Sequence, residues 1–444
     1  MRFVRCVVIA LISLIYSAEI CAAQGSPSQP APAPQQAQAV PAQPASTDAY
    51  TLPAEKLAEA KTLNRIRLTL EVVGTLWGLA VLWILLAGRW AAGLERWAAG
   101  ISRFRWIQGL IFFAAFILIT TIASLPLDAI GHAASLHYKI SVQQWPSWLG
   151  DQGKSLAIGL ILAAPLMLLF NWIVRISPRL YWVWIWVITL PLIVASVVLE
   201  PLVIDPLFNK FEPLTNTHAA LVTKLETVVA KTGTNIPPER MFLMKASEKS
   251  NGINAYVTGL GATKRYVMWD TTTDRMPDDE ILLVFGHESG HYVLNHIPKI
   301  LSITAVGLFF VFWACARFAE WLVRRFGTRW GVESVAGRAG FVTLIFAISI
   351  VGFFLTPATN TLSRHYEHEA DVYGQEAIHG LVADPQKTTV SAFNHLGEAW
   401  LEEPDPSPIV EFWDYNHPSV QTRARFAREY DPWANGGHGR FFDK

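Results

Sequence analysis

Six long apolar stretches constrain this chain more than any other feature of its sequence. They cover approximately residues 68–87, 107–125, 156–174, 180–199, 300–322 and 341–355. Most are close to the length that a helix needs to cross a hydrocarbon core of about 30 Å. Tryptophan and tyrosine gather at their ends, as in the aromatic run at 181–186, which is typical of membrane interfaces. The sequence therefore predicts a mostly α-helical bundle that spans a membrane several times.

The composition supports the same class. The chain is 52% hydrophobic and only 16% charged, and its formal net charge of zero offers nothing to attract nucleic acid. Its three cysteines, Cys6, Cys21 and Cys315, form neither a disulfide framework nor a metal-binding cluster. Glu71 and Asn171 are polar residues within or beside the apolar stretches. We expect them to have structural partners inside the bundle.

The N-terminal region has two parts that differ in composition. Residues 1–23 resemble a secretory signal, with Arg2 and Arg5 before an apolar run and small residues near 21–23 for cleavage. An uncleaved membrane anchor is the alternative. Residues 24–50 are rich in Pro, Ala and Gln and predict a disordered linker. We expect a four-span membrane region at 51–200 and a second domain at 201–444 that includes the last two spans.

The second domain carries the pattern His-Glu-x-x-His at residues 287–291. An acidic start after Pro277, followed by an apolar run at 281–285, predicts a helix there. Histidines four apart share one helix face, so His287 and His291 can bind one zinc ion. Glu288 can then take a proton from a water bound to that zinc. Strands are expected at 240–245 and 255–270, the second broken by a turn at 259–261.

A catalytic zinc needs a third protein ligand. The segment 363–371 offers four candidates, which are His365, Glu367, His368 and Glu369, and spacing alone does not choose among them. Asp371 shares a helix face with Glu367 and could accept the N–H of a ligating histidine. The plain alternative is a solvated acidic helix end.

Four separated blocks of the chain resemble the CAAX prenyl protease type 1 family, which are multi-span zinc metallopeptidases of the glutamate-ligand (gluzincin) kind. The resemblance covers roughly residues 52–430. The blocks are 206–211 (PLFNKF), 254–256 (NAY), the zinc-binding pattern at 287–291 with Asn295 and His296, and Ser363-Arg364 followed by Glu367 and Asp371.

This resemblance implies roles for particular residues. It selects Glu367 as the third ligand of one zinc ion per chain, with Asp371 behind a ligating histidine. It places His417 near the reaction centre, as a donor to the developing oxyanion, and Asn254 and Tyr256 on a substrate-binding edge strand. It also implies a large water-filled cavity within the helices. Without this resemblance, His417 would be interpreted as a solvent-facing histidine before proline, and Asn254 as an ordinary strand-end or turn residue.

The expected function is that of an integral-membrane zinc endopeptidase, in which Glu288 is the general base and the substrates are peptides or proteins in contact with the lipid bilayer. A specific protease for lipid-modified C-terminal peptides is the alternative within the enzyme class. An inactive membrane protein that keeps the fold is the alternative outside it. The signal-like N-terminus indicates a bacterium, where lipid-modified substrates would be scarce, and so favours a role in membrane-protein quality control. The sequence does not predict an oligomeric state.

The charge distribution predicts which side the active site faces. Arginines fill the expected loops 88–106, 175–179 and 323–340, whereas the opposite loop, 126–154, has only Lys139 and Lys154. Positively charged loops stay inside, and the signal-like start leads to the same orientation. Both zinc-binding segments then lie outside, which in a Gram-negative inner membrane is the periplasm. Eukaryotic members of the family are understood to face the cytosol, so the resemblance points the other way.

Overall fold

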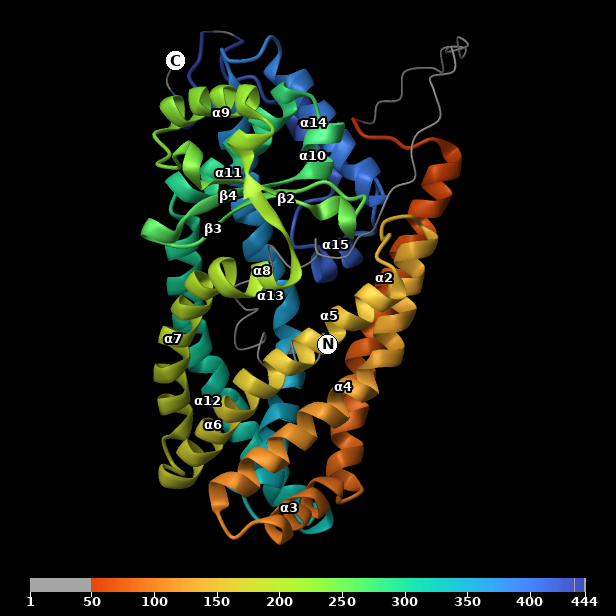
Figure 1. Cartoon of the computed structure of the whole chain (residues 1–444), viewed down its shortest axis with the longest axis vertical. Helices are drawn as coiled ribbons and strands as arrows, with labels where there is room; N and C mark the ends of the chain where they lie inside the picture. The colour runs from red at the N-terminus through yellow and green to blue at the C-terminus, as the bar shows by residue number, and fades with distance from the viewer. Residues whose placement is uncertain (1–48, 435, 443–444) are drawn as a thin grey trace.

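The protein is described by a computed structural model that covers residues 49–434 and 436–442. The predicted signal or anchor, and all but the last two residues of the predicted linker, fall outside the described residues. Long helices form a tall bundle at one end of the molecule, and a small sheet with shorter helices lies at the other (Figure 1).

Six helices in the described ranges are long and apolar enough to cross a membrane. This confirms the six predicted spans, but the helices extend well beyond the apolar stretches. Two spans contain a π-helical turn, at Gly159–Ala163 and at Glu200–Ile204. The spanning helices are α2 (Ala54–Ala87), α4 (Arg105–His137), α5 with α6 (Trp145–Ile158, Ala164–Ile176), α7 with α8 (Tyr181–Leu199, Asp205–Phe208), α12 (His296–Trp330) and α13 (Arg338–Ile378).

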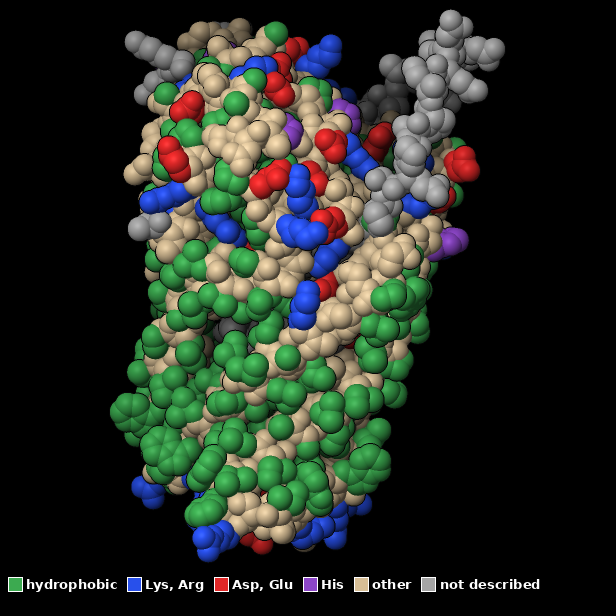
Figure 2. Space-filling model, viewed as in Figure 1, with side chains coloured by type: hydrophobic (Ala, Val, Ile, Leu, Met, Phe, Trp, Pro, Cys, Tyr) green, Lys and Arg blue, Asp and Glu red, His purple; other side chains and the backbone are tan. Residues whose placement is uncertain are grey.

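The bundle is held by apolar side chains packed between these helices. Phe112 and Phe113 of α4 are fully buried, and Phe113 meets Phe341 of α13 edge to face with ring centroids 5.5 Å apart. Asn171 donates its amide to the backbone carbonyls of Ala336 and Gly337, at 3.2 and 3.4 Å, so the structural role expected for it is confirmed. Hydrophobic side chains also gather on the face of the bundle seen in Figure 2, as a surface in contact with lipid requires.

A short helix, α3 (Trp90–Ile101), occupies part of the first predicted inside loop. Two of the predicted inside loops, 88–106 and 323–340, meet at this end of the bundle. Arg89 donates to the carbonyl of Arg329 at 2.8 Å, and Arg338 lies 3.5 Å from Glu95 and donates to the carbonyl of Arg105 at 2.9 Å. Lys and Arg side chains gather at this end in Figure 2, opposite the end that holds the sheet.

The sheet has four strands, in the order β1 (Phe211–Pro213), β2 (Met241–Met244), β4 (Arg265–Trp269) and β3 (Ala255–Thr258). β2 and β4 are parallel and the other pairs are antiparallel, so β3 is an edge strand. The predicted strands and the turn between β3 and β4 are confirmed. One face of the sheet packs on α9 (Ala219–Thr232) and α11 (Asp278–Val293) through a core that includes Tyr266 and Phe285.

The C-terminal part is helical, as expected. Its helices α14 (Pro385–Trp400), α15 (Pro408–Asp414) and α16 (Val420–Glu429) begin after Asp384, Ser407 and Ser419, and each of these side chains accepts a backbone N–H of the first turn. Such caps satisfy donors that have no partner within the helix. Within the part that holds the sheet, the short helix α10 (Asp270–Arg275) joins β4 to α11.

Two glycines allow α11 and α13 to pack closely. A Cβ added at Gly374 would lie 2.9 Å from the backbone nitrogen of His287, and one added at Gly290 would lie 3.0 Å from the Cβ of Tyr373. Ordinary side chains at either position would separate the two helices. α13 therefore packs directly against the helix that carries the histidine pattern.

Candidate metal centre

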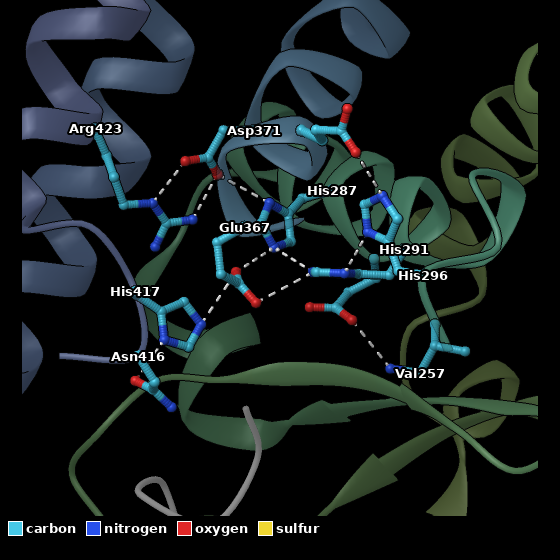
Figure 3. A network of polar contacts seen from close by, with 11 residues as sticks. Val257, His287, His291, His296, Glu367, Asp371, Asn416, His417 and Arg423 are labelled. Carbon is cyan, nitrogen blue, oxygen red and sulfur yellow. Dashed lines mark hydrogen bonds and ion pairs between the residues drawn. The ribbon is translucent and has the colours of Figure 1, made fainter. Parts of the chain in front are cut away.

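Three side chains from α11 and α13 converge on one point. They are His287 and His291, one turn apart on α11, and Glu367 of α13 (Figure 3). The Nε2 atoms of the two histidines lie 3.1 Å apart. The Glu367 carboxylate oxygens lie 3.3 Å from Nε2 of His287 and 3.5 Å from Nε2 of His291.

These separations fit a tetrahedral zinc ion. With bonds of about 2.1 Å, neighbouring ligand atoms of such an ion lie about 3.4 Å apart. Glu367 is only 3% exposed, and its Oε2 accepts no hydrogen bond from the described residues although imidazole nitrogens lie close to it. Two imidazole nitrogens and a buried carboxylate gathered around one point are what a shared cation requires. The three residues therefore fit the metal that the sequence predicts.

Negative charge behind His287 adds to this preference for a cation. Its Nδ1 lies 2.9 Å from Oδ1 of Asp371, which is 2% exposed. Arg423 of α16 binds the same carboxylate through two nitrogens, at 2.9 and 2.6 Å. Burial by itself lowers the pKa of His287, but the contacts with Asp371 and Glu367 outweigh it and raise that pKa to about 10. Asp371 thus lies behind the His287 ring, whose Nε2 is turned toward the metal point.

Glu288 lies between the histidines in sequence and contacts the edge strand. Its Oε2 accepts the backbone N–H of Val257 on β3 at 3.2 Å. Burial raises the pKa of the Glu288 carboxyl, while the nearby His287 and His291 act in the opposite direction. A raised pKa suits a carboxylate that must accept a proton and later release it.

The structure also brings His417 to the centre. It lies in the connection between α15 and α16, and its Nε2 is 3.1 Å from Oε2 of Glu367. Asn416 contacts its other ring nitrogen at 2.9 Å. Two polar residues of α13 hold the preceding segment, because Arg364 donates to the carbonyl of Glu411 at 2.8 Å and Asn360 to that of Trp413 at 2.6 Å.

The two predicted substrate-binding residues differ in their placement. Asn254 directly precedes β3, and its carbonyl accepts the N–H of Trp269 on β4 at 3.1 Å. Tyr256 lies within β3, and its side chain packs with Val267 and Trp269 on the sheet face away from α11, where its hydroxyl donates to Asp205 at 3.4 Å. The Tyr256 side chain therefore points away from the metal point, whereas Asn254 directly precedes the strand whose Val257 contacts Glu288.

The other candidate ligands on α13 have different partners. The ring of His368 packs against Phe426 with centroids 4.6 Å apart, and that of His365 lies 5.4 Å from Tyr366. Glu369 contacts His296 and Arg440. Among the described residues, Glu367 is thus the one of the four that joins the histidine pair. Sequence reasoning missed Arg423, since nothing in its local pattern marks a residue that acts on a helix 52 positions away.

Comparison with known proteins gives the family. Residues 35–210 match the CAAX prenyl protease N-terminal domain, described as five membrane helices, and residues 216–431 match peptidase family M48. The chain belongs to peptidase family M48. Members of this family are metallopeptidases that depend in general on zinc. This M48 protein is therefore a multi-pass membrane metalloprotease, and the family assignment supports a zinc metalloendopeptidase.

Similar proteins occur in bacteria and eukaryotes. The "uncharacterized metalloprotease YhfN" of Bacillus subtilis is 32% identical, over 84% of this chain and 86% of its own. CAAX prenyl protease 1 of Saccharomyces cerevisiae is 27% identical over 71% of each chain. The crystal structure of Ste24p from S. mikatae has a TM-score of 0.74 and 21% identity, and the match covers 85% of this chain and 90% of that one. This likeness confirms the fold of a helical membrane bundle with a small sheet.

Proposed function

We propose that this M48 protein is a zinc-dependent endopeptidase that hydrolyses peptide bonds in membrane-associated or unfolded proteins. His287, His291 and Glu367 would hold one zinc ion per chain. The observation that carries the proposal is the convergence of these three donors at the spacing of a tetrahedral site. When bound, the metal would polarise the scissile carbonyl and make an attacking water more acidic.

Glu288 is the general base in this proposal. It takes the proton from the attacking water and later delivers it to the leaving amine. Two features of the carboxylate support this role. Burial raises its pKa, and the Val257 N–H holds Oε2 so that the carboxylate keeps one orientation. His417 faces the same point through Nε2, where its proton would stabilise the oxyanion that develops on the substrate carbonyl.

The open edge of β3 would bind the substrate as an added strand. In an antiparallel pair, residues alternate between those whose peptide groups face the partner strand and those that face away. The Asn254 carbonyl faces β4, so the peptide groups of Ala255 and Val257 face the open edge, where Val257 already meets Glu288. An extended peptide on this edge would pass beside the metal point. The Asn254 side chain, at the start of the strand, would bond its backbone.

A role in membrane-protein quality control follows from the broad recognition that such an edge allows, since main-chain bonds carry little sequence preference. Cleavage of lipid-modified C-terminal peptides is the second candidate. It is favoured by several relatives that carry the name CAAX prenyl protease 1, among them one at 27% identity. The presence of a bacterial relative at 32% identity is one reason to prefer the broader role.

The active site would face the outside of the membrane. Arginine-bearing segments meet at the α3 end of the bundle, and the metal centre lies at the other end of α12 and α13. By the charge rule the α3 end is cytoplasmic, so in a Gram-negative cell the centre would lie on the periplasmic side. The proposed division of the chain is a signal or anchor at 1–23, a linker at 24–50, a four-span region at 51–200 and the peptidase domain at 201–444.

The proposed activity is tested with purified full-length protein and the variant Glu288→Gln. Wild type should cleave unfolded polypeptides without a lipid anchor, and Glu288→Gln should lose about 10²- to 10⁴-fold in rate, the usual contribution of a general base. Cleavage restricted to lipid-modified C-terminal peptides would favour the second candidate. Comparison of membrane proteomes from cells with either form would then identify substrates, which accumulate when the base is absent.

A further inference from the structure

The two metal-facing histidines differ in what supports their second nitrogen. His287 turns Nδ1 to the carboxylate of Asp371, but His291 turns Nδ1 to another imidazole, with 3.1 Å between its Nδ1 and that of His296 (Figure 3). Ligating histidines usually donate their second N–H to a carboxylate, a backbone carbonyl or water. For His296 to accept the N–H of His291 in the same way, its own Nδ1 must be unprotonated.

Only one arrangement of protons lets His291 bind a metal through Nε2 and form a hydrogen bond with His296 at the same time. Nε2 of His291 faces the metal point and must carry a lone pair, so its proton is on Nδ1. That proton is donated to Nδ1 of His296, which must then be unprotonated. His296, if neutral, carries its own proton on Nε2.

The surroundings of His296 favour this same tautomer. The residue is only 1% exposed, and its ring lies tilted against Tyr366 with centroids 4.7 Å apart, which limits its rotation. Its Nε2 lies 3.3 Å from Oε2 of Glu369, without the alignment of a regular hydrogen bond. A carboxylate at this nitrogen stabilises a proton there and leaves Nδ1 free to accept.

The C-terminal segment 439–442 holds Glu369 from the other side. Arg440 donates to Oε1 of Glu369 at 2.6 Å. The backbone of the segment is itself fixed, because successive N–H groups of Arg440, Phe441 and Phe442 bond the fully buried carboxylate of Glu376 at 2.6, 2.7 and 3.0 Å. Successive backbone N–H groups make a strong anion-binding concavity. A connected row of contacts thus runs from the metal point to the end of the described chain.

We propose that His296 is a positioning residue for the metal centre: its Nδ1 accepts the Nδ1 proton of His291, and Glu369, held by the segment 439–442, keeps His296 in the tautomer that can do so. This inference rests on the proposed zinc site. His296 is not a fourth ligand, because it meets the ring nitrogen of His291 that faces away from the metal point.

Three substitutions at His296 distinguish the effect of the hydrogen-bond acceptor from the effect of side-chain packing. In His296→Asn the amide oxygen stands near the place of Nδ1, so the acceptor is kept. In His296→Gln the amide lies near the place of Nε2, and in His296→Leu no acceptor remains. Zinc affinity is measured on purified full-length protein by competition with a chelator. His296→Leu and His296→Gln should bind zinc about 10- to 100-fold more weakly than wild type, and His296→Asn within about threefold of it.

Two further measurements distinguish a change in the metal site from a general loss of folded structure. The absorption spectrum of the cobalt-substituted protein reports the geometry of the ligands, and it should change in His296→Leu and be restored in His296→Asn. The unfolding temperature of the metal-stripped variants shows whether each has folded. Glu369→Gln, which keeps an oxygen opposite Nε2, should weaken zinc binding less than Glu369→Leu.

The outcomes are distinguishable from those for the proposed function. If wild type binds no zinc, the proposed site itself is wrong. If wild type binds zinc and His296→Leu or His296→Gln binds it equally well, only the positioning role is wrong. Weakening in Asn, Gln and Leu alike would also overturn it, since then the placement of the acceptor has no effect.

Discussion

At the scale of single residues, Asp371 contacts both a metal-facing histidine and an arginine. It meets His287 at Nδ1 and accepts two bonds from Arg423, so it orients a metal-facing ring while its own charge is balanced. Asp371→Asn keeps the shape and one oxygen but removes the charge. We expect zinc affinity or activity to fall about 10- to 100-fold, as is usual for such partners. Chelator competition measures this, and unchanged affinity together with unchanged activity would show that Asp371 has no influence on the site.

The choice of the third ligand is a second prediction at this scale. Glu367→Ala should abolish zinc retention during purification, because it removes one of three donors at the metal point. Glu369→Ala should weaken binding without abolishing it, because Glu369 acts through His296. Metal content after dialysis compares the two variants. Loss of zinc in Glu369→Ala alone would show that the ligand has been assigned to the wrong glutamate.

Sequence alone predicts residues whose spacing is set by one helix, and it predicts the others less well. His287, Glu288 and His291 follow from the helical period. Glu367 is far away in the chain, and only its likeness to a known motif separates it from His365, His368 and Glu369. The Tyr256 side chain lies on the other face of the sheet, since alternate residues of a strand point to opposite faces.

At the scale of elements, the site depends on how closely α11 approaches α13. A Cβ at Gly374 would lie 2.9 Å from the nitrogen and 3.1 Å from the Cα of His287. Gly374→Ala should force the helices apart, destabilise the fold by about 1–3 kcal/mol and lower zinc affinity.

Gly352 provides a matched control on the same helix, because a Cβ there would meet nothing within 4 Å. Gly352→Ala should be neutral or slightly stabilising, since alanine favours a helix by about 1 kcal/mol over glycine. Thermal unfolding and chelator competition test both variants. Equal behaviour of the pair would contradict the view that close packing of α11 and α13 builds the site.

The apolar stretches predict which helices exist but not where they end. The apolar run at 341–355 continues as α13 to Ile378, past Pro357. Hydropathy marks only the apolar part of a helix, whereas the C-terminal part of α13 packs against α11, α14 and α16. This continuation carries Glu367 and Asp371 from the bundle to the peptidase helices. A helix that belongs to both parts cannot be recognised from local composition.

At the scale of the whole molecule, the distribution of charge predicts that the metal centre faces the outside of the membrane. The structure brings loops 88–106 and 323–340 together at the α3 end, through Arg89 with Arg329 and Arg338 with Glu95. A reporter fused after Lys444 should be active if it requires the periplasm and inactive if it requires the cytosol. A fusion within 88–106 should show the opposite pattern. Cytosolic activity at the C-terminus would reverse the topology and move the substrates to the other side of the membrane.

The central claim is that His287, His291 and Glu367 hold one zinc ion, and metal analysis of the purified protein tests it most directly. Wild type should contain one zinc per chain. Glu288→Gln should retain that zinc while losing peptidase activity, because Glu288 handles protons and does not ligate. His291→Ala should lose the metal. A folded wild-type protein without zinc, or a His291→Ala variant that keeps a full equivalent, would contradict the account.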